Sequence, residues 1–179
     1  MKPFVSEDVV ARAKNITCLV LDVDGVMTNG RIIYDEFGDE LKMFDVQDGT
    51  GVVWWHRAGF KTIMITARQA RAVQRRAKEL HVDLLVQKAL KKLPAYEQAL
   101  KRLRVAPEQT CVMGDDLLDL PLLRRAGLSV AVANAVEDVK TSCHYVTTNS
   151  GGAGAIREVV ELLFQAKGLW EQVKKPYLI

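Results

Sequence analysis

The sequence predicts an α/β fold in which helices flank a parallel β-sheet. Short apolar runs of strand length recur along the chain, and amphipathic segments of helical length alternate with them. Strands and helices in this alternation form parallel sheets through right-handed crossovers. With 179 residues, of which 49% are hydrophobic, the chain is long enough for one domain with a sizeable core.

Each element has its own local signal. Strands are apolar runs bounded by glycine, proline or acidic residues, and helices carry apolar residues three and four positions apart. Two β-rich runs around a polar, glycine-containing loop predict a small β-hairpin inserted over residues 31–46. In chain order, the expected elements are a helical lead-in over 1–15, strand 17–21, the hairpin, a helix from 48 to about 59, strand 61–66, helix 69–80, strand 84–86, helix 92–104, strand 110–113, helix 118–126, strands 128–132 and 145–147, helix 153–166, and a tail over 174–179 without obvious structure.

Composition excludes several function classes. The formal net charge is only +3 and the sequence has no dense basic run, which argues against nucleic acid as a partner. The three cysteines are too few and too scattered for a disulfide framework or a zinc site, and they indicate a reducing compartment. No apolar run resembles a signal peptide or is long enough to span a membrane. We therefore expect a cytoplasmic protein with neither nucleic acid nor membrane as a partner.

The first predicted strand ends in a pair of carboxylates, Asp22 and Asp24, followed by Gly25. In open parallel sheets, ligands bind just beyond the carboxyl ends of the strands. Two carboxylates this close repel each other in a partly desolvated site, and a hard divalent cation such as Mg2+ would offset their charge. The simpler alternative is that Asp-Gly is only a turn.

Further polar residues follow the later strands. Thr66 ends the second strand, Lys92 opens the helix after the third, and Asp115, Asp116 and Asp119 follow the fourth. Each alone has a simpler explanation, such as a helix cap or a solvated lysine. Together they supply a carboxylate nucleophile, a second carboxylate for proton transfer, metal ligands, a hydroxyl group and a cation. The set predicts phosphoryl transfer at one rim of the sheet.

These motifs resemble those of the haloacid dehalogenase superfamily. Residues 22–26 are similar to its DxDGV/T signature, Thr66 to its second motif, Lys92 to its third, and 114–116 with Asp119 to its fourth. Longer segments resemble the 3-deoxy-D-manno-octulosonate 8-phosphate (KDO 8-phosphate) phosphatases, namely 22–30, 44–51, 65–68, 114–121, 127–133 and 151–158. The resemblance implies a single hydrolase domain over 1–179 with a Rossmann-like sheet, the hairpin at 31–46 and no cap domain.

The resemblance also implies a role for each site residue. Asp22 would attack phosphorus and form an aspartyl-phosphate, and Asp24 would be the acid and then the base. Mg2+ would be the cofactor. Its ligands would be the Asp22 side chain, the Asp24 backbone carbonyl and the Asp115 side chain. Asp116 and Asp119 would contact these ligands rather than the metal, or act through water. The phosphate group would be held by Thr66, Lys92 and Gly25.

Arginine residues after the second strand are candidates for recognising a substrate carboxylate. A guanidinium group binds a carboxylate in a bidentate fork, so Arg68 is the first candidate and Arg71 a weaker one. The alternative is that Arg68 is an ordinary arginine on a helix surface. The histidines are expected to be structural or surface residues, and the tryptophans to lie in the core or a subunit interface: His56, His81, His144, Trp54 and Trp55.

The resemblance implies a phosphatase of lipopolysaccharide biosynthesis that hydrolyses KDO 8-phosphate. One departure from the family pattern is Ala67, where glycine is usual, and Asp45 and Gln47 also differ. A phosphatase for a nine-carbon, sialic-type sugar acid phosphate is therefore an alternative. A phosphomutase usually carries a sizeable cap, for which this chain lacks room. In a receiver signalling module, the acidic pair precedes the phosphoacceptor, whereas here Asp24 comes after the candidate nucleophile.

The hairpin predicts a homo-oligomer. A two-stranded hairpin is marginal alone, and its edges invite pairing with another chain. Four of its apolar residues would be poorly buried on a monomer: Ile32, Ile33, Met43 and Phe44. We expect a tetramer in which hairpins of different subunits pair and help to cover a neighbour's site, as the resemblance also implies. The tail, with Lys174, Lys175 and Tyr177, is a further candidate for a segment that reaches over a site.

Overall fold

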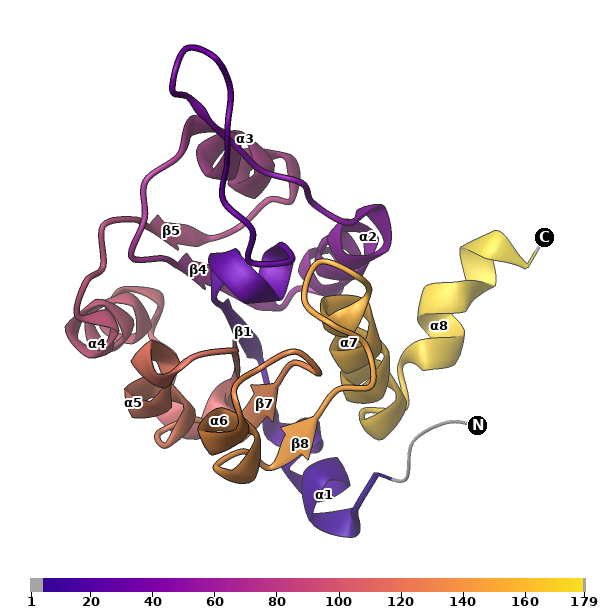
Figure 1. Cartoon of the computed structure of the whole chain (residues 1–179). Coiled ribbons are helices and arrows are strands. Elements are labelled where there is room, and N and C mark those ends of the chain that lie inside the picture. The colour runs from indigo at the N-terminus through magenta and orange to yellow at the C-terminus, as the bar shows by residue number, and fades with distance from the viewer. Residues whose placement is uncertain (1–4, 179) are drawn as a thin grey trace.

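The computed structural model describes residues 5–178 and confirms the predicted α/β fold (Figure 1). Its main sheet has six strands in the order β5-β4-β1-β6-β7-β8, and all of its neighbouring strands pair in parallel. The central strands β1, β6 and β7 are buried along their whole length because helices cover both faces of the sheet. A parallel order with β1 at its centre brings the ends of β4, β1 and β6 side by side.

The element bounds agree closely with the sequence prediction. The strands of the main sheet are β1 (Cys18–Leu21), β4 (Lys61–Ile65), β5 (Leu84–Val86), β6 (Thr110–Gly114), β7 (Leu128–Ala131) and β8 (Tyr145–Val146). The helices are α1 (Glu7–Asn15), α2 (Val46–Arg57), α3 (Arg71–Glu79), α4 (Lys92–Leu103), α5 (Leu120–Leu123), α6 (Glu137–Thr141), α7 (Ala155–Ala166) and α8 (Trp170–Lys174). The part of the predicted lead-in helix at residues 1–4 lies outside the described residues.

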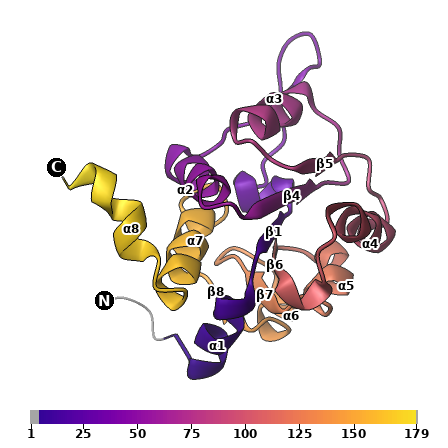
Figure 2. The ribbon, with the colours of Figure 1, turned by 180° about the vertical axis from the view of Figure 1, so that it is seen from behind.

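Helices pack on both sides of the sheet, as Figures 1 and 2 show together. Helix α7 contacts both α1 and α2 on one face, and α4 and α5 lie on the other. The buried core lies between the sheet and these helices. Trp55, Tyr96 and Phe164 are among its largest side chains. No helix within residues 5–178 is long and apolar enough to cross a membrane.

The predicted hairpin forms a small sheet of its own above the rim of the main sheet (Figure 1). Its antiparallel strands are β2 (Ile33–Tyr34) and β3 (Glu40–Leu41), shorter than the apolar runs in the sequence. The turn closes because the Asp35 side chain accepts hydrogen bonds from the backbone of Phe37 and Asp39.

Three local predictions were wrong. The expected helix over 118–126 is a 3₁₀ turn, η3 (Leu117–Asp119), followed by the short α5, and helix α6 was not predicted at all. The tail is not structureless within the described residues, because α8 continues into a 3₁₀ turn, η4 (Lys175–Tyr177). The tail is ordered by tertiary contacts: the Trp54 indole donates a hydrogen bond to the Tyr177 hydroxyl (2.9 Å), and its ring packs against Trp170.

A buried carboxylate ties helix α2 to helix α7. Asp48 lies in the first turn of α2 and is 2% exposed. It accepts hydrogen bonds from the backbone N–H groups of Gly154 (3.2 Å) and Arg157 (2.8 Å), which are unpaired donors at the start of α7. Asp48 therefore caps a helix other than its own, although burial raises the pKa of its carboxyl group.

Replacing Asp48 by alanine should destabilise the fold. The change leaves two buried backbone donors without partners, at a cost of about 2–3 kcal/mol in the free energy of unfolding. Urea unfolding followed by circular dichroism measures this cost. A matched control is Glu97→Ala, whose exposed carboxylate lies 3.8 Å from Arg125 and should contribute less than about 0.5 kcal/mol. Equal stability of the Asp48→Ala and Glu97→Ala proteins would contradict the capping role.

Candidate active site

The candidate site lies where strands β4, β1 and β6 end side by side. Asp22 and Asp24 follow β1, Thr66 follows β4, and Asp115 follows β6. After β1 the chain turns through a π-helical segment, η1 (Val23–Met27), in which Asp24 and Gly25 have non-helical dihedral angles. This irregular turn holds both aspartates of the sequence motif at the rim of the sheet.

Lys92 joins two buried carboxylates. Its ammonium group lies 2.6 Å from Asp22 Oδ1 and 2.6 Å from Asp119 Oδ1. All three side chains are at most 6% exposed. Asp119 is itself fixed, because its other oxygen accepts the backbone N–H of Asp115 (3.2 Å). Although burial favours the neutral amine, the two carboxylates hold the pKa of Lys92 above its usual value.

The carboxylates outnumber the cations in this cluster. Asp22, Asp115 and Asp119 bring oxygen atoms within 4.8 Å of one another, and Lys92 supplies one positive charge among them. Burial, together with the charge of Asp119, holds the pKa values of Asp22 and Asp115 well above the usual range of an aspartate. With all of these carboxylates ionised, the cluster carries about two uncompensated negative charges, which disfavours the empty site electrostatically.

A divalent cation fits this cluster. Oxygen donors from carboxylates are the ligands that Mg2+ prefers, and two positive charges would balance the excess. The Asp115 carboxylate packs directly against the turn, because Gly25 has no side chain and a Cβ atom there would overlap that carboxylate. Gly25 also has φ +110°, a conformation that side chains disfavour. Asp22 and Asp115 could hold the ion, whereas both oxygens of Asp119 are engaged, one by Lys92 and the other by a backbone amide.

Asp116 lies further from this cluster. It is exposed, and its side chain accepts a hydrogen bond from the backbone of Leu117 (2.7 Å), which starts the η3 turn. The structure therefore places Asp119 in contact with Lys92, whereas Asp116 points its carboxylate at the chain that follows it.

Asp24 is held at both of its oxygens. Its Oδ2 accepts a hydrogen bond from the Thr66 hydroxyl (3.2 Å), and its Oδ1 forms an ion pair with Lys42 of the hairpin segment. The Thr66 oxygen in turn accepts the backbone N–H of Arg68 (3.0 Å), so the hydroxyl proton points toward Asp24. The second aspartate of the motif is thus separate from the cluster around Lys92.

Arg68 is bound to the hairpin in this structure. Its Nε and Nη2 atoms lie 3.0–3.3 Å from the carboxylate of Glu40, and Nη2 lies 3.4 Å from the Tyr34 hydroxyl. The fork expected to bind a substrate carboxylate is therefore occupied by a carboxylate of the protein. Although burial opposes it, hydrogen bonds from Arg68 and Lys42 lower the pKa of Glu40.

Sequence reasoning missed Lys42 and Glu40 as site residues. A signal was present: in the segment from Glu40 to Met43, charged residues alternate with apolar ones. Such alternation puts the charged side chains on one face of an extended segment and the apolar ones on the other. The sequence did not reveal which face would meet the rim.

The turn that carries the aspartate motif is supported from the opposite side of the rim. The Asn134 side chain donates to the backbone oxygen of Gly25 (3.4 Å) and accepts the backbone N–H of Gly151 (2.7 Å). A Cβ atom at Gly151 would overlap the backbone at Gly25, so this close approach requires glycine. Neither Asn134 nor Gly151 was predicted to contact the site.

The remaining candidates lie elsewhere. His56 and His81 stack on each other at 5.1 Å, and His144 lies 2.7 Å from the Ser129 hydroxyl, all outside the carboxylate cluster. Trp55 is fully buried in the core. Arg71 begins α3 and borders a polar hollow of about 620 Å³ between the hairpin and α3, to which Tyr34 and Glu40 also contribute.

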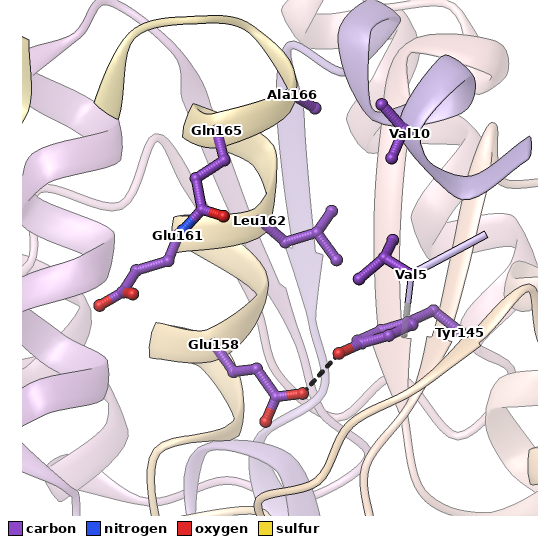
Figure 3. Close-up of a pocket in the computed structure, with 8 residues that line it drawn as sticks. All are labelled: Val5, Val10, Tyr145, Glu158, Glu161, Leu162, Gln165 and Ala166. Atoms are coloured by element: carbon purple, nitrogen blue, oxygen red, sulfur yellow. Dashed lines mark hydrogen bonds between the residues drawn. The ribbon is translucent and has the colours of Figure 1, made fainter. Parts of the chain in front are cut away.

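A second hollow of about 420 Å³ is separate from the site. Figure 3 shows it between α7, α1 and β8, with Leu162 and Val10 among its walls. Two of its polar groups bond to each other: the Tyr145 hydroxyl donates to Glu158 (2.7 Å), which also accepts the backbone N–H of Thr148. This arrangement stabilises the loop that precedes α7 and supplies no reactive group.

Comparison with known proteins finds relatives that match most of the chain. Residues 84–159 match the model of the haloacid dehalogenase-like hydrolases. The chain is 42% identical to the KDO 8-phosphate phosphatase KdsC of Escherichia coli K12 over 170 residues, which cover 95% of this chain and 90% of that protein. The crystal structure of the Yersinia pestis phosphatase aligns with a TM-score of 0.91 at 42% identity, over 93% of this chain and 90% of that one.

A third similar protein was crystallised with ligands. The KDO 8-phosphate phosphatase of Moraxella catarrhalis, in complex with a magnesium ion, a phosphate ion and KDO, aligns with a TM-score of 0.92 at 36% identity. The alignment covers 95% of this chain and 98% of that one. Sequence identity of this extent, over nearly all of both chains, shows the family. The chain belongs to the KDO 8-phosphate phosphatases, a family of haloacid dehalogenase-like hydrolases.

Proposed function

We propose that the chain hydrolyses KDO 8-phosphate to KDO and phosphate through an aspartyl-phosphate on Asp22, with Mg2+ as cofactor. The observation that carries the proposal is the arrangement at the rim. Asp22 belongs to the carboxylate cluster and contacts Lys92, and Asp24 is held separately by Thr66. The similarity to phosphatases named for KDO 8-phosphate supports this substrate.

The first half of the reaction transfers the phosphoryl group to the protein. An oxygen of Asp22 attacks phosphorus and forms the P–O bond, while the bond from phosphorus to the sugar oxygen breaks. Asp24 donates its proton to that leaving oxygen. Lys92 would hold the phosphoryl oxygens, and Thr66 would join it by turning its hydroxyl proton from Asp24 to the phosphate. With the backbone of the turn at Gly25, they would balance the charge of the phosphoryl group.

The second half returns the protein to its starting state. Asp24, now a carboxylate, accepts a proton from a water molecule as that water attacks phosphorus. The P–O bond to Asp22 breaks and phosphate leaves. Asp22, Asp115 and the backbone carbonyl of Asp24 would hold Mg2+, which when bound neutralises charge on the phosphoryl group. Asp119 orients Lys92, and Asp116 would act only through water.

The sugar part of the substrate would lie between the rim and the hairpin. Arg68 is 37% exposed and would bind the sugar carboxylate through the edge of its guanidinium group that Glu40 does not cover. The polar hollow beside Arg71 adjoins this edge and would take the hydroxyl groups of the sugar.

A phosphate-release assay with Mg2+ tests the proposed substrate. KDO 8-phosphate should be turned over with a kcat/KM at least about tenfold above that for a nine-carbon, sialic-type sugar acid 9-phosphate, a difference of about 1.4 kcal/mol. Glucose 6-phosphate, which lacks the carboxylate, is the control and should be a poor substrate. Preference for the nine-carbon substrate would overturn the assignment to KDO 8-phosphate while leaving a sugar-acid phosphatase.

We also propose that the chain acts as one domain that assembles into a homotetramer through the hairpin. The side chains of Ile32, Ile33 and Met43 are 39–69% exposed, which is unfavourable for apolar groups clustered on a small two-stranded sheet. Phe44 is an exception, because it packs against the core beneath the Arg76 guanidinium. Contact of the tail with a neighbouring site stays a prediction.

Adding a charge at Ile33 should break the assembly. Ile33→Asp should give smaller species in light scattering and lose most activity on sugar-acid phosphates, whereas small generic esters should be affected less. Val146→Asp is a matched control, since Val146 is 38% exposed on the edge strand of the main sheet and Ile33 is 39% exposed. A wild-type protein that is fully active as a monomer would refute the hairpin assembly.

A further inference from the structure

The segment from Glu40 to Met43 buries its charged side chains and exposes its apolar ones. Glu40 and Lys42 direct their charged side chains toward the rim and are 10% and 1% exposed, whereas Leu41 and Met43 are 49% and 69% exposed. A soluble protein gains free energy from the opposite arrangement, with apolar groups inside and charges in water. The inward charges therefore need a reason in the residues that they contact.

Lys42 contacts two carboxylates and almost no solvent. Its ammonium group forms ion pairs with Oδ1 of Asp24 and with Glu40 (2.5 Å). Removing a lysine from water costs several kcal/mol unless its charge is paired and its donors are bonded. Both conditions are met here, so the location of the ammonium group is fixed by two oxygen atoms on different segments of the chain.

A chain of charged contacts leads from Arg68, in the loop between β4 and α3, to Asp24. Arg68 holds the Glu40 carboxylate at both oxygens, and Glu40 in turn holds Lys42. Asp24 is thereby gripped from two sides, by Lys42 at Oδ1 and by Thr66 at Oδ2. Rotation of the Asp24 carboxylate would break one of these contacts, which makes its orientation a property of the hairpin segment as well as of the sheet.

We propose that Lys42 is a positioning residue for the acid function of Asp24, and that Glu40 and Arg68 fix Lys42 in place. The inference rests on the proposed function, in which Asp24 protonates the leaving oxygen. A general acid must lie within hydrogen-bond reach of that oxygen, and a displacement of about 1 Å costs on the order of 100-fold in rate. Lys42 supplies this alignment without touching the substrate.

Dependence on the leaving group distinguishes positioning from a structural role. A sugar or simple alkyl alcohol leaves as a strongly basic oxygen and needs the proton from Asp24. p-Nitrophenolate is stable as an anion and leaves without it. Loss of the alignment should therefore slow alkyl phosphates selectively. Damage to the fold or to the phosphate site would slow both classes equally.

The experiment measures leaving-group release in the first turnover, which reports the first half-reaction alone. Lys42→Met keeps the length of the side chain and removes its charge. It should slow release from an alkyl phosphate by about 100-fold and from p-nitrophenyl phosphate by less than about threefold. Lys101→Met, an exposed lysine on α4, is the matched control and should leave both rates unchanged. Equal losses with both substrates, or no loss with either, would overturn the proposal.

Asp24→Asn provides the reference. If Asp24→Asn slows both substrates equally, the acid role in the proposed function fails, and the role of Lys42 fails with it. If Asp24→Asn shows the selective loss and Lys42→Met does not, only the positioning role is wrong.

A second variant covers the case in which Lys42→Met does not fold. Lys42→Ala leaves a space that ethylammonium can enter. Added ethylammonium should restore alkyl phosphate turnover in the folded protein several-fold, with little change for p-nitrophenyl phosphate. Absence of this rescue in folded Lys42→Ala protein would count against positioning by the ammonium group.

Discussion

Asp22→Asn should reduce phosphatase activity by at least about 10⁴-fold while the protein stays folded. Asparagine matches aspartate in shape, but its amide is not a nucleophile toward phosphorus. The side chain is buried among Lys92, Asp115 and Asp119, and removing one negative charge relieves repulsion within that cluster. We therefore expect a melting temperature equal to or above that of the wild type. Phosphate release and thermal unfolding measure the two effects.

The matched control for Asp22→Asn is Asp138→Asn, which makes the same change at an exposed position on α6. It should keep full activity and stability, as surface substitutions usually do. Activity within tenfold of wild type in Asp22→Asn would rule out Asp22 as the nucleophile. A loss of the folded state in this variant would contradict the electrostatic account of the cluster.

Removal of Mg2+ should abolish turnover, and added Mg2+ should restore it. Asp115→Ala should raise the Mg2+ concentration needed for half-maximal activity by more than about 100-fold, because changes in groups that only support a metal ligand cost about 10–100-fold. Among the acidic residues that follow β6, Asp115 is the one whose carboxylate approaches Asp22 and does not bond Lys92. Titration of activity with Mg2+ measures the shift.

Asp116→Ala is the comparison within the same sequence motif. Its carboxylate is exposed and bonded to the backbone of Leu117, so the shift in Mg2+ requirement should be much smaller than that for Asp115→Ala. Full activity after exhaustive chelation would show that no metal is needed. A larger shift in Asp116→Ala than in Asp115→Ala would show that the ligand set is wrong.

The main sheet could be predicted because its signals are local. The runs at β1, β4 and β6 are mainly apolar, and each is followed by polar residues at the point where the strand ends. The tail could not be predicted, because α8 is short and its order depends on Trp54, which lies more than a hundred positions earlier in the chain. Short helices gain most of their stability from tertiary packing rather than from local propensity.

The site, like the fold, has residues that the sequence could predict and residues that it could not. The motif residues around Asp22 follow strand ends, so the parallel topology alone brings them to one rim. Lys42 and Glu40 reach the rim only because the hairpin folds back over it, a placement that no local pattern specifies. The contact between Arg68 and Glu40 could not be predicted for the same reason, since the two residues lie on different segments and meet only in the folded protein.

Trapping the phosphorylated protein tests the central claim most directly. Wild-type protein is mixed with 32P-labelled KDO 8-phosphate and Mg2+, quenched in acid within the first turnover, and digested for mass spectrometry. The account predicts one labelled acyl-phosphate, at Asp22, which appears before free phosphate and decays as phosphate is released. Turnover with no protein-bound phosphate at Asp22 at any time, or with the label on another residue, would contradict it.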